Sequence, residues 1–124
     1  MTHEQLSKRT FELSCKLMDL YTTLIRQNEL ELSTRVLKYG LSIRKHAECA
    51  ASSLNQMEFT EATSMAYDMA VQTRYWLKLV QMKHPLCKPN DECVELLNGI
   101  INSLNYMLSQ NDNKYQFQLT YPVN

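Results

Sequence analysis

The 124-residue chain is long enough for one domain and too short for two. Its 13 Lys and Arg residues balance its 13 Asp and Glu residues, so it lacks the basic surplus that is usual in nucleic-acid-binding domains. It contains two Gly and three Pro residues. That scarcity argues against the many turns of a β-sandwich or barrel and favours a few long helices.

The first expected helix spans residues 3–28 and carries two apolar rows. One row recurs at helical spacing and is expected to fill a core: Leu6, Leu13, Leu17, Leu20 and Leu24. A second row runs beside it and consists of Phe11, Cys15, Met18 and Ile25. A helix of a monomeric bundle needs one such row, so we expect Phe11, Met18 and Ile25 to meet another subunit.

The second expected helix spans residues 31–54. Its seam combines small and large apolar residues: Val36, Gly40, Ile43, Ala47, Ala50 and Leu54. Gly inside a helix costs about 1 kcal/mol relative to Ala, so Gly40 predicts a close approach of a neighbouring helix. Four basic residues form a candidate phosphate-binding face: Arg35, Lys38, Arg44 and Lys45. Of these, Arg35, Lys38 and Lys45 share one side of the helix. A solvated helix face is the simpler interpretation at zero net charge.

The third expected helix spans residues 56–83, with Asn55 as its N-cap and Glu58 as the capping partner. Its apolar seam alternates steps of three and four: Phe59, Ala62, Ala66, Met69, Thr73, Trp76 and Val80. This pattern predicts that Trp76 is an anchor of the core. Pro85 ends the helix, because the residue before Pro avoids helical angles.

The fourth expected helix begins after Asn90, its expected N-cap, and ends near residue 110. Its seam is Val94, Leu97, Ile101, Leu104 and Leu108. The last residues, 111–124, alternate apolar and polar side chains and are expected to form an extended tail. Phe117 and Tyr121 of this tail are further candidates for a subunit interface. The pattern as a whole predicts an all-α, antiparallel up-down-up-down four-helix bundle over residues 1–110.

No residue pattern in the sequence indicates a catalytic or metal-binding site. We therefore expect no enzymatic activity and no bound metal or cofactor. His46 and Cys49 could share a helix face, but a closed zinc site requires four ligands at firm spacing. The Glu-x-x-His pattern of di-iron bundles and the glycine-rich phosphate loop do not occur in the sequence. The four cysteines, the polar start and the lack of a long apolar run favour a cytoplasmic protein with free thiols and no membrane contact.

Three stretches carry a resemblance to a known family. They are Ser7-x-x-x-Phe11, then Leu32-Ser33 with Gly40-x-Ser42-Ile43, and Ala66 to Ala70 with Thr73-x-Tyr75-Trp76-Leu77. In this order they resemble the four-helix-bundle proteins encoded by intervening sequences in bacterial 23S ribosomal RNA genes. The resemblance covers residues 7–108. The chain departs from the family pattern at three polar positions, which are occupied by His46, Cys49 and Gln72.

The resemblance implies a bundle that assembles as a homo-oligomer, commonly a pentameric ring, without a settled biochemical activity. The chain is also similar to the accessory bundle of diversity-generating retroelements, which is basic and binds nucleic acid, whereas this chain is neutral. The expected function is therefore a non-enzymatic oligomeric scaffold. RNA, a reverse transcriptase or a ribosome-associated protein is the expected partner besides a second copy. The alternative is a nucleic-acid-binding accessory protein that uses the basic face of residues 31–54.

Overall fold

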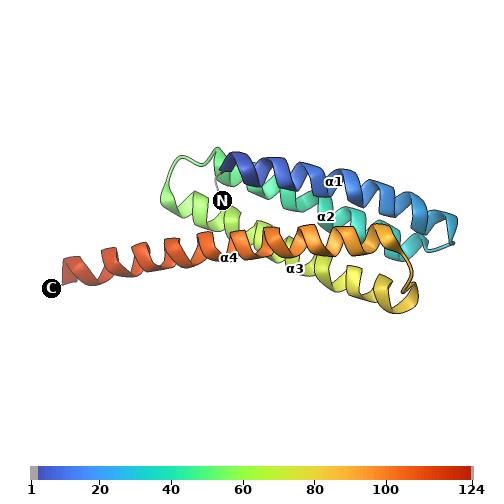
Figure 1. Cartoon of the computed structure of the whole chain (residues 1–124). Coiled ribbons are helices and arrows are strands. Elements are labelled where there is room, and N and C mark those ends of the chain that lie inside the picture. Colours follow the sequence, from blue (N-terminus) through green and yellow to red (C-terminus); the bar gives the residue numbers. More distant parts are fainter. Residues whose placement is uncertain (1–2, 124) are drawn as a thin grey trace.

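Four α-helices form the structure, a computed structural model that describes the backbone of residues 3–123 and the side chains of residues 3–110. They are α1 (His3–Arg26), α2 (Leu30–Ala51), α3 (Gln56–Lys83) and α4 (Lys88–Val123). The described backbone contains no strand. The all-α four-helix bundle predicted from the sequence is therefore confirmed (Figure 1).

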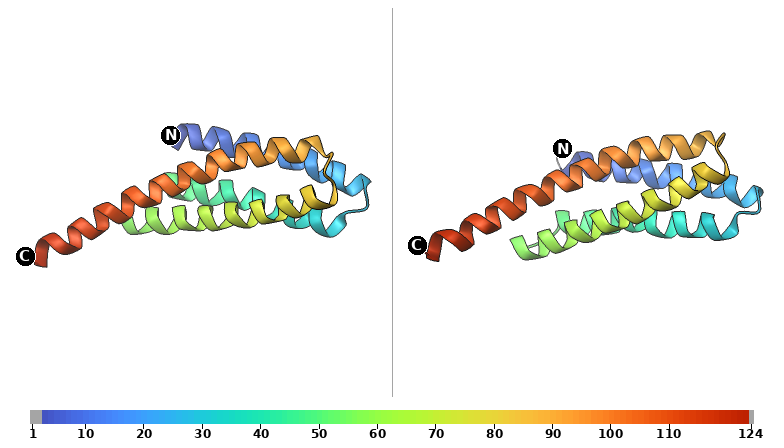
Figure 2. Two further views of the ribbon diagram at one scale, coloured as in Figure 1. Left: turned by 60° about the horizontal axis from the view of Figure 1, so that its bottom comes forward. Right: turned by 90° about the horizontal axis from the view of Figure 1, so that it is seen from below.

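The helices enclose one apolar core. α1 packs against α2 and α4, and α3 packs against the same two helices, so each helix has two neighbours. The two further views show this arrangement from other sides (Figure 2). The largest fully buried side chains come from all four helices: Leu6, Leu13, Leu17, Leu20, Leu24, Val36, Ile43, Leu77, Val80, Leu97, Ile100 and Leu104. Each such side chain contributes about 1.5–3 kcal/mol when it leaves water.

The predicted core faces of α1 and α2 are confirmed, with one exception. Every Leu of the predicted core row of α1 is buried, and so is the α2 seam from Val36 to Ala50. A Cβ atom on Gly40 would overlap Leu17 and would lie 3.6 Å from Cγ2 of Thr73. Gly40 therefore marks the predicted close approach. The exception is Leu54, which is exposed in the α2–α3 link because α2 ends at Ala51.

The predicted seam of α3 was wrong at several positions. The buried residues are Thr63, Ala66, Ala70, Thr73, Leu77 and Val80. Trp76 lies at the flank of α3 and is half-buried, so it is not the predicted core anchor. Gly40 of α2 lies close to Thr73, since a Cβ atom there would be 3.6 Å from Cγ2 of Thr73, so the close contact with α2 falls on the row of Thr73 and not on that of Trp76.

α4 differs from the prediction at both ends. It begins at Lys88, and Asn90 is a buried residue of its first turn, where Nδ2 donates to the Leu77 carbonyl at 3.2 Å. Its C-terminal part stays helical to Val123 and extends past the other helices (Figures 1 and 2). The expected extended tail at 111–124 is thus replaced by helix up to Val123. The only Gly or Pro after Gly99 is Pro122, so nothing in the sequence stops the helix earlier.

Two links have well-defined turn chemistry. Asn28 has a φ of 62°, and the amides of Asn28 and Glu29 donate to the carbonyls of Ile25 and Leu24, which together form a Schellman motif. Asn tolerates this left-handed conformation better than most residues. At the start of α3, the Asn55 side chain accepts from the Glu58 amide at 2.9 Å, which confirms the predicted N-cap.

Candidate functional site

The second apolar row of α1 is exposed in the single chain. Phe11 is 54%, Met18 is 58% and Ile25 is 37% exposed. These residues are seven apart, so they lie on one side of the helix. Aromatic and aliphatic side chains of this size, exposed in a row, are unusual on a monomer surface.

α2 extends this row into a wider surface. Leu30 and Leu41 are exposed, and Leu37 between them is half-buried against the core. Their spacing places them on the side of α2 that also carries Arg44, and Arg44 contacts α1. We call the exposed set the α1–α2 surface: Phe11, Met18, Ile25, Leu30 and Leu41. Leu30 and Leu41 were not predicted as part of this surface, although their spacing with Leu37 was a usable signal.

Arg44 fixes the edge of the α1–α2 surface. Its guanidinium lies over the Phe11 ring, 5.0 Å from the centroid, and its Nη2 lies 3.7 Å from the Glu48 carboxylate. Glu48 also accepts a hydrogen bond from the Ser7 hydroxyl of α1. This chain of contacts crosses from α2 to α1, so Arg44 holds Phe11 in place by a cation–π contact of about 0.5–1 kcal/mol.

The four basic residues of the predicted nucleic-acid face do not converge. Arg35 and Arg44 are separated by about two and a half turns and so lie on opposite sides of α2. Arg35 pairs with Glu31 at 3.2 Å and lies over the Trp76 ring of α3, 4.8 Å from its centroid. Lys38 and Lys45 lie on the outer side of α2 and are exposed. Of the four basic residues, only Lys38 and Lys45 both share a face and lack an ion-pair partner among residues 3–110.

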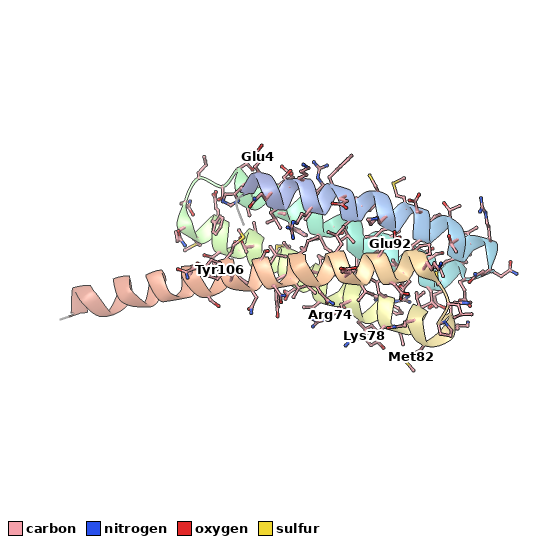
Figure 3. All side chains as sticks on the ribbon, viewed as in Figure 1. Glu4, Arg74, Lys78, Met82, Glu92 and Tyr106 are labelled. Atoms are coloured by element: carbon pink, nitrogen blue, oxygen red, sulfur yellow. The ribbon has the colours of Figure 1, made fainter. Side chains whose placement is uncertain are left out.

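A second apolar surface lies on α3, next to α2. Tyr75 is 53% and Met82 is 80% exposed, and the centroids of the Tyr75 and Trp76 rings lie 5.2 Å apart in an edge-to-face arrangement. Met82 lies along the outer side of α3 with Arg74 and Lys78 (Figure 3). A groove of about 550 Å³ runs beside these residues and is lined by Glu29, Glu31, Leu32, Trp76, Leu79, Met82 and Lys83. We call Tyr75, Trp76, Leu79 and Met82 the α3 surface.

His46 and Cys49 line a shallow groove at the other end of α2. Glu58, Glu61 and Met65 of α3 also line this groove. Among the described residues, no three His, Cys, Asp or Glu side chains gather closely enough to hold a metal ion. The arrangement offers polar contacts rather than a ligand set, and Gln72 is not part of this groove.

One charged cluster joins two links at the end of the bundle. The Glu29 carboxylate accepts from Nζ of Lys83 at 2.7 Å and lies 3.2 Å from Nε2 of His84. The hydrogen bond from Lys83 is the main reason that the pKa of Glu29 lies below its ordinary value, with His84 adding to the effect. This cluster ties the α1–α2 link to the end of α3.

Two further predictions concern the subunit interface at the C-terminus and contact with a membrane. Phe117 and Tyr121 lie outside the residues whose side chains are described. In the described part of the chain, no helix is both long enough and apolar enough to cross a membrane.

The comparisons with known proteins identify a structural neighbour. A crystal structure of a protein of unknown function from Bacteroides thetaiotaomicron, assigned to the S23 ribosomal protein family, superposes with a TM-score of 0.82 at 21% sequence identity. The match covers 88% of this chain and 99% of that chain. No family model matches the chain, and no curated protein matches it. The neighbour shares the four-helix fold and is consistent with the family resemblance in the sequence.

Proposed function

We propose that the protein is a non-enzymatic scaffold of the 23S intervening-sequence type that acts as a homo-oligomer in the cytoplasm. The observation that carries the proposal is the α1–α2 surface, an apolar row exposed on two adjacent helices. Burying such a surface stabilises association by about 25 cal/mol per Å² of apolar area, before the entropy of association is subtracted. A second copy is the expected partner because the same surface occurs on every chain.

The proposed subunit is an antiparallel up-down-up-down bundle. Support comes from contacts between helix ends: Ser7 near the start of α1 bonds Glu48 near the end of α2, and Glu29 before α2 pairs with Lys83 at the end of α3. The links between helices are short, as this topology requires. The family resemblance suggests a pentameric ring.

The mass of the particle in solution tests the oligomer. Size-exclusion chromatography with light scattering should give a multiple of the 14.5 kDa chain mass at micromolar concentration. Phe11→Asp combined with Ile25→Asp should release monomers that keep their helical circular dichroism, because neither side chain belongs to the core. Tyr106→Asp, at an exposed aromatic residue of α4, is the matched control and should leave the mass unchanged. A wild-type mass of one chain would refute the proposal.

The alternative function is nucleic-acid binding through the outer side of α2. Lys38 and Lys45 support it, since they share this side and neither is held by a carboxylate among residues 3–110. Arg35 and Arg44 are already paired with Glu31 and Glu48, which weakens it. Titration of a labelled RNA at two salt concentrations tests the alternative, because affinity from phosphate contacts falls steeply with salt. Lys38→Glu with Lys45→Glu should abolish such binding.

A further inference from the structure

The second half of α3 and the link to α4 form a basic segment in a chain of zero net charge. Between Asp68 and Asp91 the sequence contains no Asp or Glu, but besides His84 it contains four basic residues: Arg74, Lys78, Lys83 and Lys88. Glu29 holds Lys83. The other three take part in no ion pair among residues 3–110, and neither do Asp68 and Asp91. This surface therefore carries cations that the described chain leaves unpaired.

The unpaired cations and the groove beside Trp76 lie on different flanks of α3. Arg74 and Lys78 are each two residues from Trp76, so they point away from the flank on which Trp76 contacts Arg35 of α2. Arg74, Lys78 and Met82 follow one another at intervals of one turn along the outer side of α3 (Figure 3). Met82 also lines the groove of about 550 Å³, so it joins the two flanks.

The groove offers apolar area to a partner. Leu32, Trp76 and Leu79 line it and are half-buried, so a side chain of Leu size that enters it leaves water on several sides. We infer that α3 docks an acidic amphipathic helix of another protein, which places its apolar row in the groove and its carboxylates over Arg74 and Lys78. This inference rests on the proposed scaffold function and gives the scaffold a class of protein partner besides a second copy.

Two carboxylates in the groove favour a peptide over a nucleic acid. Glu29 and Glu31 both line it, and a nucleic acid carries a phosphate on every nucleotide, so a strand in the groove would meet both of them. An amphipathic helix can instead confine its charges to one side. The Trp76 ring is also a poor platform for a base, because the Arg35 guanidinium already lies over it, 4.8 Å from its centroid.

Three synthetic peptides test the occupant. Each has about 18 residues, enough for about five helical turns, with an Ala background and no Trp. The Leu/Glu peptide carries a Leu row at helical spacing with Glu on one flank of the row. The Leu/Lys peptide has Lys in place of each Glu, and the shuffled peptide has the composition of the Leu/Glu peptide in an order that breaks the Leu row.

Trp76 reports the binding. It is the sole Trp of the chain and lines the groove, so its emission should shift to shorter wavelength when an apolar row covers it. The Leu/Glu peptide should bind about tenfold more tightly than either of the other two, because only this peptide matches both the groove and the cations.

Charge reversal on the protein gives a matched pair of variants. Arg74→Glu with Lys78→Glu should weaken the Leu/Glu peptide by about tenfold and make the Leu/Lys peptide the tighter ligand. Lys8→Glu with Lys45→Glu makes the same change of net charge at exposed positions of α1 and α2 and should leave both affinities unchanged. Met82→Asp, at an exposed position of the groove, should weaken both peptides. Circular dichroism establishes that each variant is folded, and Lys78→Glu alone replaces the first pair if that pair unfolds the chain.

Titration of the wild type and of the monomeric Phe11→Asp, Ile25→Asp variant separates this inference from the proposed oligomer. A wild-type chain that is monomeric and prefers the Leu/Glu peptide refutes the oligomer and supports the docking surface. An oligomer without that preference keeps the proposed assembly and overturns the docking surface. Binding by the monomeric variant alone would place the α3 surface between copies of the chain and would also overturn it.

A single-stranded oligouridine tests the competing ligand class. At the same salt concentration it should bind more weakly than the Leu/Glu peptide and should leave the Trp76 emission unshifted. If the RNA binds more tightly than the peptide, and Arg74→Glu with Lys78→Glu removes that binding, the cations serve a nucleic acid and the inference is overturned.

Discussion

The backbone of α2 at Gly40 lies directly against the Leu17 side chain of α1, and a Cβ atom there would overlap it. Leu17 is fully buried, so any shift of its side chain has to be accommodated inside a close-packed core. Gly40→Leu should therefore lower the free energy of unfolding by about 1–3 kcal/mol or more, as overpacking does. Urea unfolding measures the change. Lys38→Leu, at an exposed position two residues earlier, is the control and should be mild. Equal tolerance at both positions would contradict the close contact.

The core of α3 depends on Leu77 more than on its neighbour Trp76. Leu77 is fully buried, whereas Trp76 is half-buried at the flank beneath Arg35. Leu77→Ala should cost about 2–5 kcal/mol of stability, because it leaves a cavity in the core. Trp76→Ala should cost less than Leu77→Ala, in spite of the larger side chain. Chemical denaturation of the two variants compares them directly, and the reverse order would restore Trp76 as the core anchor.

How far the sequence predicts this fold is clear from α1 and α3. On α1, Leu13, Leu17 and Leu20 stand out because one branched residue type recurs at helical spacing, and all three are buried. On α3, small and large apolar residues occupy adjacent rows, so the pattern cannot distinguish the core row from the flank. Trp76 was predicted to be the anchor because it continues the seam from Phe59 to Val80. The buried row of α3 runs instead through Ala70, Thr73 and Leu77.

The candidate site was predictable in part for a similar reason. Phe11, Met18 and Ile25 were found because α1 has one apolar row more than a bundle needs. Which side of α2 meets them depends on how the helices pack, and this is not a local property of the sequence. The spread of Arg35 and Arg44 to opposite sides could have been read from their spacing of nine residues. Their acidic partners were equally visible, since each has a Glu four residues away.

Removal of the N-cap of α3 should lower the stability less than a core substitution does. The Asn55 side chain accepts from the Glu58 amide, and Glu58 in return accepts from the Leu54 amide at 3.1 Å. Asn55→Ala should lower the stability by about 1 kcal/mol, because the first turn of α3 loses its acceptor. Asn55→Asp should keep the stability close to that of the wild type. Thermal unfolding followed by circular dichroism measures both, and a neutral Asn55→Ala would show that the cap is dispensable.

The Glu29 cluster should make stability depend on acid pH. The pKa of Glu29 in the folded chain is lower than its ordinary value of 4.5, chiefly because Lys83 donates to the carboxylate. Its contribution is therefore complete above that ordinary value and is lost as the pH falls through the lower, folded-state pKa. The urea midpoint of the wild type should fall with acidification in this range. Glu29→Gln should be less stable at neutral pH and should lose part of that dependence. Parallel curves for the two proteins would contradict the assignment.

The thiols should divide into two classes by reactivity. Cys15 and Cys49 are exposed, whereas Cys87 and Cys93 are buried in the native chain. Burial raises the pKa of Cys93 to about 12, so its thiolate, the reactive form, is scarce at neutral pH. In the monomeric Phe11→Asp, Ile25→Asp variant, where the α1 row that includes Cys15 is uncovered, a disulfide reagent should label two thiols per folded chain rapidly and all four after unfolding in urea. Cys15→Ser with Cys49→Ser should remove the rapid phase and leave the slow one, whose rate then reports the opening of the core around α4. Rapid labelling of Cys93 in this double variant would show that the start of α4 opens without global unfolding.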